Sequence, residues 1–189
     1  GHIAAVGFDL YCRLLQRAVE DQRAALGTGA RDKTMVAAGD GDVLQAPNIE
    51  LPLEAQIPED YVGDASLRLR LYRRMADVLK SPQVDEIGHE FQDRFGPPPE
   101  PVKNLLYLLR VKLAARAANV AAINMDDGQV LVRFRSEDRE RMNRLTGRYA
   151  GRVRVALDRF WLAGPDADPY WDRRLIEAVQ FAASPGENS

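Results

Sequence analysis

The sequence is poor in the side chains that most small catalytic and metal sites use. It contains one cysteine, Cys12, and two histidines, His2 and His89, among 189 residues. A single cysteine cannot form a disulfide within the chain, so we expect a reducing, cytoplasmic environment. No basic residue is predictably placed to activate Cys12 as a nucleophile, and we interpret it as a small residue of a first helix.

The two histidines do not have the spacing of a metal site. A zinc protease helix needs a second histidine four residues from the first, and the dipeptide His89-Glu90 has none. Glu86 and His89 have the spacing of half of a carboxylate-bridged metal site, but the other half is missing from the sequence. We therefore expect no metal and no cofactor in this chain, and we interpret His89 as a solvated residue beside carboxylates.

Two longer patterns are also missing. No glycine-rich loop is followed by the lysine that would contact the terminal phosphates of a nucleotide, so we do not expect this chain to hydrolyse nucleotides. No run of 18 apolar residues and no signal peptide occurs, which predicts a soluble protein with no membrane contact.

Hydrophobic residues make up 46% of the chain, enough for a domain with its own core, and charge is unevenly distributed. Residues 1–102 hold 11 basic and 17 acidic side chains (net −6), and residues 103–159 hold 13 and 6 (net +7). Residues 160–189 hold 2 and 5 (net −3). A basic block therefore lies between two acidic ones.

The stretch 85–109 is the strongest local pattern. Val84, Ile87, Phe91 and Phe95 fall on one side of a helix at about 100° per residue, which predicts a buried stripe. The far side of this helix carries Glu86, Glu90 and Asp93. Gly96 can end the helix, and the prolines at 97–99 fix the direction in which a second apolar helix begins.

Before this stretch, helical spacing predicts a long amphipathic helix within residues 1–26, and the glycines of 27–47 predict a flexible linker. We place the start of a domain, 48–183, after that linker. Alternating apolar residues near 49–53 predict a strand that Pro52 confines to a sheet edge. We expect a helix to begin at Asp64 and the central helix to begin at an N-cap, Ser81.

After residue 119 the period changes to that of strands. Two runs, 120–125 and 129–135, flank Asp126-Asp127-Gly128, which is typical of a hairpin. A helix capped by Ser136, two short strands near 152–162, a last helix from Asp168 and a tail over 184–189 complete the prediction. The predicted fold class is α/β of the α+β type, with helices packed on a small mixed or antiparallel sheet.

Arginines alternate with apolar residues in the predicted strands, so each strand would bury one face and expose arginine on the other. A basic helix stripe lies between these strands. This candidate basic surface consists of Arg133, Arg135, Arg141, Arg144, Arg148, Arg152 and Arg154. Glutamates four residues before Arg141 and Arg144 can neutralise them, and aromatic residues are not interleaved as in single-strand binding platforms. A basic nucleic-acid-binding module therefore stays an alternative to a solvated or protein-docking face.

Several motifs have the order and spacing of one known family. They are the run 57–62 (IPEDYV), the run 69–74 (LRLYRR), the run 93–97 (DRFGP), and Pro101-Val102 with 104–106 (NLL). These motifs resemble the C-terminal domain of the bacterial transcription-repair coupling factors, the Mfd family. Residues 1–11 are similar to the end of the translocation motif that precedes this domain in the family. The resemblance covers 1–26 and 48 to about 118, and departs from the family's pattern at Pro98 and in the long loop 27–46.

The resemblance implies a fragment of an ATP-dependent DNA translocase that removes stalled RNA polymerase and recruits excision repair through UvrA. In that family the C-terminal domain is not the motor, so ATP and magnesium would belong to the rest of the protein. It docks on a UvrB-like module of the same protein, masks the UvrA-binding surface and restrains the motor. The matched docking residues are Glu90 and Asp93, whereas Phe95 and Gly96 match structural positions. Double-stranded DNA and RNA polymerase would be partners of the full-length protein.

Overall fold

The computed structural model describes residues 46–184, which form two compact units. The first unit takes in Leu53–Leu108, and the second takes in Pro47–Pro52 and the chain from Leu109 onward. The expected helix within 1–26, the linker as far as residue 45 and the tail from residue 185 lie outside the described residues, as do Cys12 and His2. The predicted domain of 48–183 thus contains two units.

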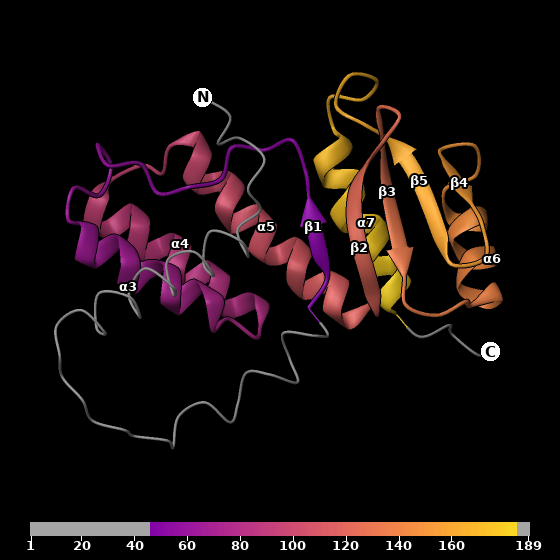
Figure 1. Cartoon of the computed structure of the whole chain (residues 1–189), viewed down its shortest axis with the longest axis horizontal. Coiled ribbons are helices and arrows are strands. Elements are labelled where there is room, and N and C mark those ends of the chain that lie inside the picture. Colours follow the sequence, from indigo (N-terminus) through magenta and orange to yellow (C-terminus); the bar gives the residue numbers. More distant parts are fainter. Residues whose placement is uncertain (1–45, 185–189) are drawn as a thin grey trace, which may run out of the picture. The chain divides into compact units, whose positions relative to one another are not determined.

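The first unit is built from three helices (Figure 1): α3 Ala65–Ala76, α4 Ser81–Phe95 and the first part of α5 Glu100–Ala117. Helix α3 begins where expected, because Oδ1 of Asp64 accepts hydrogen bonds from the N–H groups of Ser66 (2.8 Å) and Leu67 (3.1 Å). The core is made of Leu71, Tyr72 and Met75 of α3, Val84, Ile87 and Phe91 of α4, and Val102, Leu105 and Leu106 of α5. The apolar stripe predicted for the central helix is therefore confirmed at three of its four positions, while Phe95 is half-buried.

The ends of α4 differ slightly from the prediction. Ser81 is not the N-cap but the first helical residue, and Lys80 occupies the cap position. The reason is the side chain of Gln83, whose Oε1 accepts hydrogen bonds from the backbone N–H groups of Leu79 and Lys80, both at 2.9 Å. Gly96 ends the helix as expected, with a φ of 85° that disfavours any residue with a side chain.

The segment before α3 is tied to the helices by two tyrosines. The N–H of Ile57 donates to the hydroxyl of Tyr72 at 2.7 Å. The hydroxyl of Tyr61 lies 2.7 Å from the carbonyl oxygen of Gly96 and 3.0 Å from that of Phe91, and its one proton can serve either. Partial burial raises the pKa of Tyr61, so the hydroxyl stays protonated and fastens the end of α4.

The second unit contains a mixed five-stranded sheet in the order β1-β2-β3-β5-β4. Its strands are β1 Asn48–Glu50, β2 Val120–Asp126, β3 Gln129–Phe134, β4 Val153–Val155 and β5 Arg159–Ala163. Only β1 pairs in parallel, with β2, and the other described pairs are antiparallel. The α+β prediction and the edge position of the first strand are confirmed.

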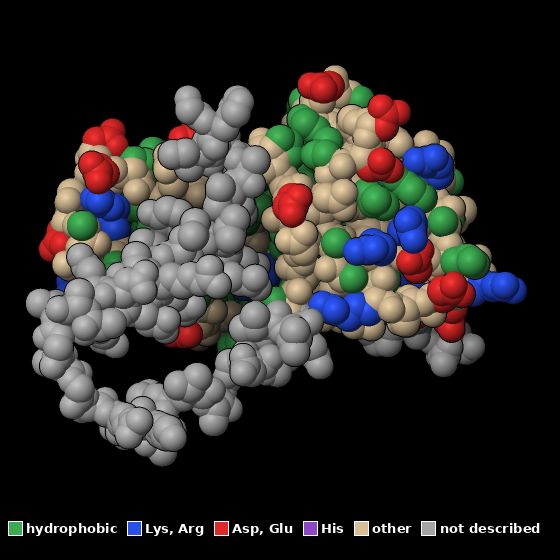
Figure 2. Space-filling view, in the orientation of Figure 1, with side chains coloured by type: hydrophobic (Ala, Val, Ile, Leu, Met, Phe, Trp, Pro, Cys, Tyr) green, Lys and Arg blue, Asp and Glu red, His purple; other side chains and the backbone are tan. Residues whose placement is uncertain are grey.

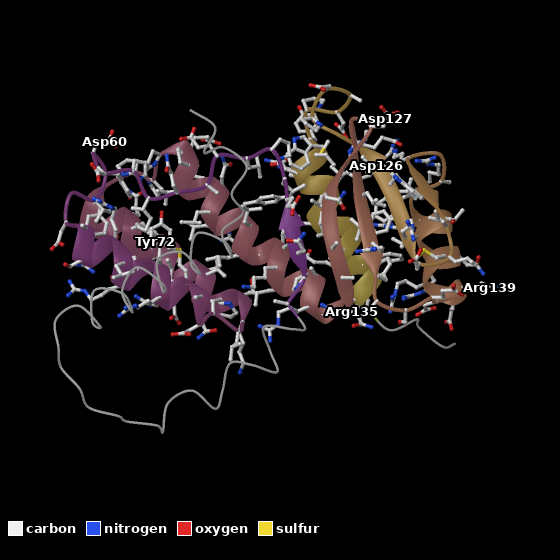
Figure 3. All side chains as sticks on the ribbon, viewed as in Figure 1. Asp60, Tyr72, Asp126, Asp127, Arg135 and Arg139 are labelled. Atoms are coloured by element: carbon white, nitrogen blue, oxygen red, sulfur yellow. The ribbon has the colours of Figure 1, made fainter. Side chains whose placement is uncertain are left out.

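The hairpin between β2 and β3 turns through Asp127 (φ 48°) and Gly128 (φ 75°). Two consecutive residues with positive φ are typical of the tight turn that the Asp-Gly pair predicts. Figure 3 shows Asp126 and Asp127 at this tip and Arg135 beyond the opposite end of β3. Gly164 passes so close to the turn that an added Cβ would lie 2.1 Å from the carbonyl oxygen of Gly128.

Two further helices, α6 Arg139–Arg148 and α7 Trp171–Ala183, belong to this unit, and α7 runs behind the sheet in Figure 1. Ser136 does not cap α6, because Asp138 holds that position and its Oδ1 accepts from the N–H of Arg141 at 2.9 Å. Helix α7 begins after Tyr170 rather than at Asp168, since Asp168 is used in the preceding turn, where its Oδ1 accepts from Tyr170 N–H at 3.0 Å.

One face of the sheet is buried and the other is open. The buried face carries Ile123, Val130, Val132, Phe134, Phe160 and Leu162. None of the helices formed by residues 46–184 is long and apolar enough to cross a membrane.

Candidate functional site: the charged face of α4

Helix α4 carries Glu90 and Asp93 opposite its buried stripe of Val84, Ile87 and Phe91. Residues three apart are neighbours on a helix surface, so the two carboxylates belong to one face. The two side chains differ in their exposure to solvent. Asp93 is exposed, whereas only 23% of the Glu90 side chain is accessible to solvent.

Glu90 is held by two arginines. Its Oε2 accepts from Nη1 of Arg74 on α3, and its Oε1 accepts from Nη1 of Arg94 one turn further along α4 at 2.5 Å. Asp93 makes no ion pair with any residue between 46 and 184. The sequence placed both carboxylates on an exposed face, and only Asp93 has the full exposure expected.

The two arginines change the protonation of Glu90. Partial burial, the largest single influence, would raise the pKa of this carboxyl, but the hydrogen bonds from Arg94 and Arg74 and the positive charges of the two side chains together outweigh it, and the pKa is lowered. Glu90 is therefore ionised at neutral pH and joins α3 to α4 as part of an Arg74–Glu90–Arg94 cluster.

Aromatic packing supports this end of α4. The ring of Phe95 lies 5.8 Å from that of Tyr61 and 6.2 Å from that of Phe91, measured between centroids. The guanidinium of Arg94 lies 5.2 Å from the Phe95 ring centre. The motif residues Phe95 and Gly96 thus hold the helix end on which Asp93 is presented, which agrees with a structural role for both.

Helix α3 adds further arginines that the sequence placed on its outer surface. Arg68 is occupied, since it donates to the carbonyl oxygen of Val62 (2.7 Å) and pairs with Glu59 (2.7 Å). Arg70 and Arg73 are exposed and pair with no residue of the described part of the chain. Sequence reasoning did not connect this arginine row with Glu90, because the α3–α4 contact is tertiary.

The candidate basic surface of the second unit is less continuous than the alternation of arginines predicted. Arg133, Arg135, Arg148, Arg152 and Arg154 are exposed. The other two arginines of the set pack on aromatic rings. The guanidinium of Arg141 lies 4.5 Å from the ring centre of Phe134, and that of Arg144 lies 5.7 Å from the ring centre of Phe181. Their inward nitrogens are buried without hydrogen-bond acceptors, which is consistent with guanidinium groups covered by ring faces.

The partners expected for the helix arginines also differ. Arg141 pairs with Asp138, at 3.4 Å, rather than with Glu137. The reason is that Asp138 caps α6 and therefore already faces its first turn. Arg141 thus contributes to the fold of the second unit and not to a free basic stripe.

Trp161, on the open face of the sheet, is already in contact with two charged side chains. The guanidinium of Arg154 lies 4.0 Å from the ring centre of Trp161, and the indole N–H donates to Asp126 at 2.6 Å. On the face of this unit that Figure 2 shows, basic and acidic side chains are interspersed. A stacking platform for nucleic-acid bases needs free aromatic faces, so the surface does not favour the nucleic-acid alternative.

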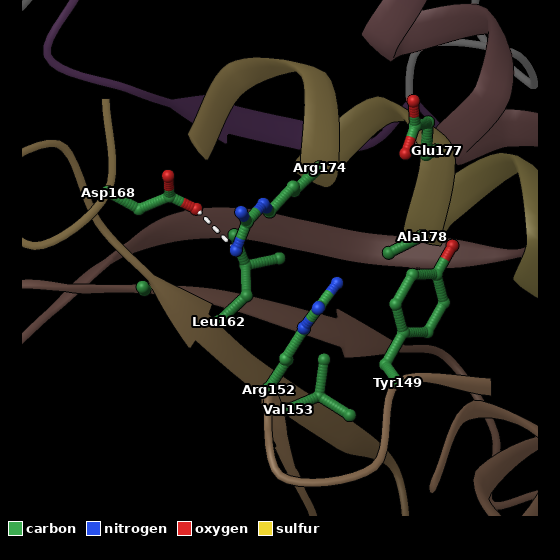
Figure 4. A pocket seen from close by; sticks show the side chains of 9 residues that line it. Tyr149, Arg152, Val153, Leu162, Asp168, Arg174, Glu177 and Ala178 are labelled. Carbon is green, nitrogen blue, oxygen red and sulfur yellow. Dashed lines mark ion pairs between the residues drawn. The ribbon is translucent and has the colours of Figure 1, made fainter. Parts of the chain in front are cut away.

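A small cavity of about 90 Å³ lies beside α7 in the second unit (Figure 4). Asp168 and Arg174 line it as an ion pair at 2.9 Å, and Arg152, Glu177 and Tyr149 complete its polar wall. Burial first, and the charge of Glu177 second, raise the pKa of Tyr149, which keeps its hydroxyl neutral. Two cations and two anions line the cavity, and of the anions the buried Asp168 carboxylate forms an ion pair with Arg174.

No group of three metal-ligating side chains occurs within residues 46–184. His89 is exposed on α4. The cluster around Glu90 joins two helices of the first unit, α3 and α4, through an ion pair.

Comparison with known proteins identifies the family of the chain. Residues 51–145 match the family model of the TRCF domain. The chain is 36% identical over 123 residues to the transcription-repair-coupling factor of Mycobacterium tuberculosis, covering 65% of this chain and 10% of that protein. It is 34% identical over 124 residues to that of Haemophilus influenzae, covering 66% and 10%.

The chain therefore spans about a tenth of the length of these curated relatives. The fold resembles a solved structure described as the C-terminal domain of transcription-repair coupling factor, with a TM-score of 0.60, 19% identity, and coverage of 74% of this chain and 91% of that one. With the motifs, the helical unit that carries them and the family match all in agreement, the chain belongs to the TRCF domain family of the transcription-repair coupling factors (Mfd).

Proposed function

We propose that this chain is the regulatory C-terminal domain of a transcription-repair coupling factor and that it docks, through α4, on a UvrB-like module of the same protein. Docking would mask the surface that UvrA uses and hold the motor in a restrained state. The observation that carries the proposal is Asp93, an exposed carboxylate without an ion pair among the described residues, on a helix fixed by a packed core. A rigidly presented charge loses little conformational freedom when it meets a partner arginine.

In this proposal the chain itself is not an enzyme. ATP, magnesium, double-stranded DNA and RNA polymerase would be bound by other parts of a cytoplasmic, ATP-dependent translocase. The chain would act by occupying the UvrB-like module until the protein engages a stalled polymerase.

The strength of such a contact can be bounded. Loss of one partner of a desolvated charge pair costs about 2 to 5 kcal/mol, which is roughly one and a half to three and a half powers of ten in affinity. Asp93→Ala should therefore weaken docking by at least about tenfold. The domain should keep its own stability, because the Asp93 carboxylate has no ion-pair partner to lose among residues 46–184.

The test is to titrate this chain into a separately purified UvrB-like module and to measure the dissociation constant by calorimetry. Asp60→Ala is the matched control, since it removes the same charge from an exposed turn of the same unit. We expect Asp93→Ala to weaken the complex and Asp60→Ala to leave it within about twofold. Equal affinities for all three proteins, or no complex with the unchanged chain, would refute the docking proposal.

A further inference from the structure

The Arg74–Glu90–Arg94 cluster has an excess of positive charge. One carboxylate lies between two guanidinium groups, and each of its oxygens is already taken by one of them. Each guanidinium carries five N–H groups and donates only one of them to Glu90. About half of each arginine side chain, 48% for Arg74 and 49% for Arg94, is accessible to solvent.

Water satisfies this excess charge while the face is free. Glu90 lies three residues before Asp93 and is therefore its neighbour on the helix surface. A partner that covers both carboxylates also covers the guanidinium groups of Arg74 and Arg94, which bind Glu90. If the partner brought only an arginine for Asp93, one positive charge and several N–H donors would be enclosed without compensation. An uncompensated buried charge is among the most costly features that an interface can contain.

We propose that Arg74 and Arg94 are themselves part of the docking surface and that the partner presents a carboxylate to them, beside the basic side chain that meets Asp93. The inference rests on the proposed function and specifies the chemistry of the partner surface: one acidic and one basic group, placed side by side. A surface that was only basic would be repelled by the cluster.

This assignment also changes the role of Glu90. Its charge is already neutralised within the domain, so it is a positioning residue that holds two guanidinium groups at the right separation. Asp93 then supplies the only free negative charge of the pair. The two carboxylates that share one helix face would thus act through different contacts.

The experiment measures binding of the same UvrB-like module to the unchanged chain, to Arg74→Gln and to Arg94→Gln. Arg73→Gln is the control, because Arg73 is an exposed neighbour on α3 with no ion pair among the described residues. We expect each of the first two substitutions to weaken docking by about tenfold or more and the control to change it by less than about twofold. Melting temperatures measured in parallel report any loss of fold.

The direction of the change decides between the alternatives. If the partner offers no carboxylate, removing the excess positive charge makes burial easier, and Arg74→Gln and Arg94→Gln bind more tightly or equally well; either result overturns the inference. If Asp93→Ala weakens docking while both arginine variants bind normally, the proposed function stands and this inference fails. If the unchanged chain does not bind the module, both are refuted.

Discussion

Replacing Glu90 by alanine should destabilise the first unit slightly and measurably. The substitution removes an ion pair within α4 to Arg94 and an ion pair between helices to Arg74. A helix pair four residues apart contributes about 0.3 to 0.5 kcal/mol, and a pair with half-exposed partners contributes up to about 1 kcal/mol. The higher helix propensity of alanine offsets a few tenths of a kcal/mol.

The expected net loss is therefore about 1 kcal/mol, which lowers the melting temperature of a chain of this size by about 2 to 4 °C. Purely sequence-based reasoning predicts no change, because it treats both carboxylates as free. Far-UV circular dichroism is a suitable assay for the helical unit. Tryptophan fluorescence is not, since Trp161 and Trp171 belong to the second unit.

A double-mutant cycle isolates the pair between helices. Glu90→Ala and Arg74→Ala, measured singly and together, should show a coupling of about 0.5 to 1 kcal/mol, because the propensity terms cancel in the cycle. Asp93→Ala serves as the reference and should leave the melting temperature unchanged. Additive effects of the two substitutions, or a loss above about 3 kcal/mol for Glu90→Ala alone, would refute the ion-pair geometry described above.

Four further outcomes follow from the structure. Folding lowers the pKa of Glu90, so the ionised carboxylate contributes its full stabilisation at neutral pH. This contribution is lost as the pH falls below the unfolded pKa of about 4.5 and through the folded pKa. The free energies of unfolding of Glu90→Ala and of the unchanged chain, measured in urea, should therefore converge in acid. Gly164→Ala should lower the free energy of unfolding by more than about 2 kcal/mol, because the added Cβ would collide with the Gly128 carbonyl oxygen. Gly147→Ala should instead raise it by about 0.5 to 1 kcal/mol in thermal unfolding, because an added Cβ on α6 has no neighbour within 4 Å. Binding to double-stranded DNA should be weak at physiological salt and unchanged by Arg154→Gln, whose guanidinium covers Trp161; a tight complex with a steep salt dependence would favour the nucleic-acid alternative. The chain alone should show no nucleotide hydrolysis, and a turnover that copurifies with it through several columns would contradict this.

Much of the architecture was determined by local sequence alone. The spacing of Val84, Ile87 and Phe91 specifies the buried side of α4 because a helix places these residues together whatever surrounds it. Gly96 and the turn at Asp127-Gly128 have the positive φ values that their residue types allow at low cost. Helix starts were less predictable, since Asp138 and not Ser136 caps α6, and both residue types satisfy the same local rule.

Only the tertiary structure decided how the charges are used. Sequence periodicity shows that Glu90 and Asp93 share a face, but not that α3 places Arg74 against Glu90, because that contact joins residues 16 apart through the packing of two helices. In the same way, the alternation of arginines shows which strand residues avoid the core, but not that Arg141 would lie over Phe134 or that Arg154 would cover Trp161. Long cationic side chains are neutralised by whatever the fold brings within reach, and that is set by the packing of distant elements rather than by the local sequence.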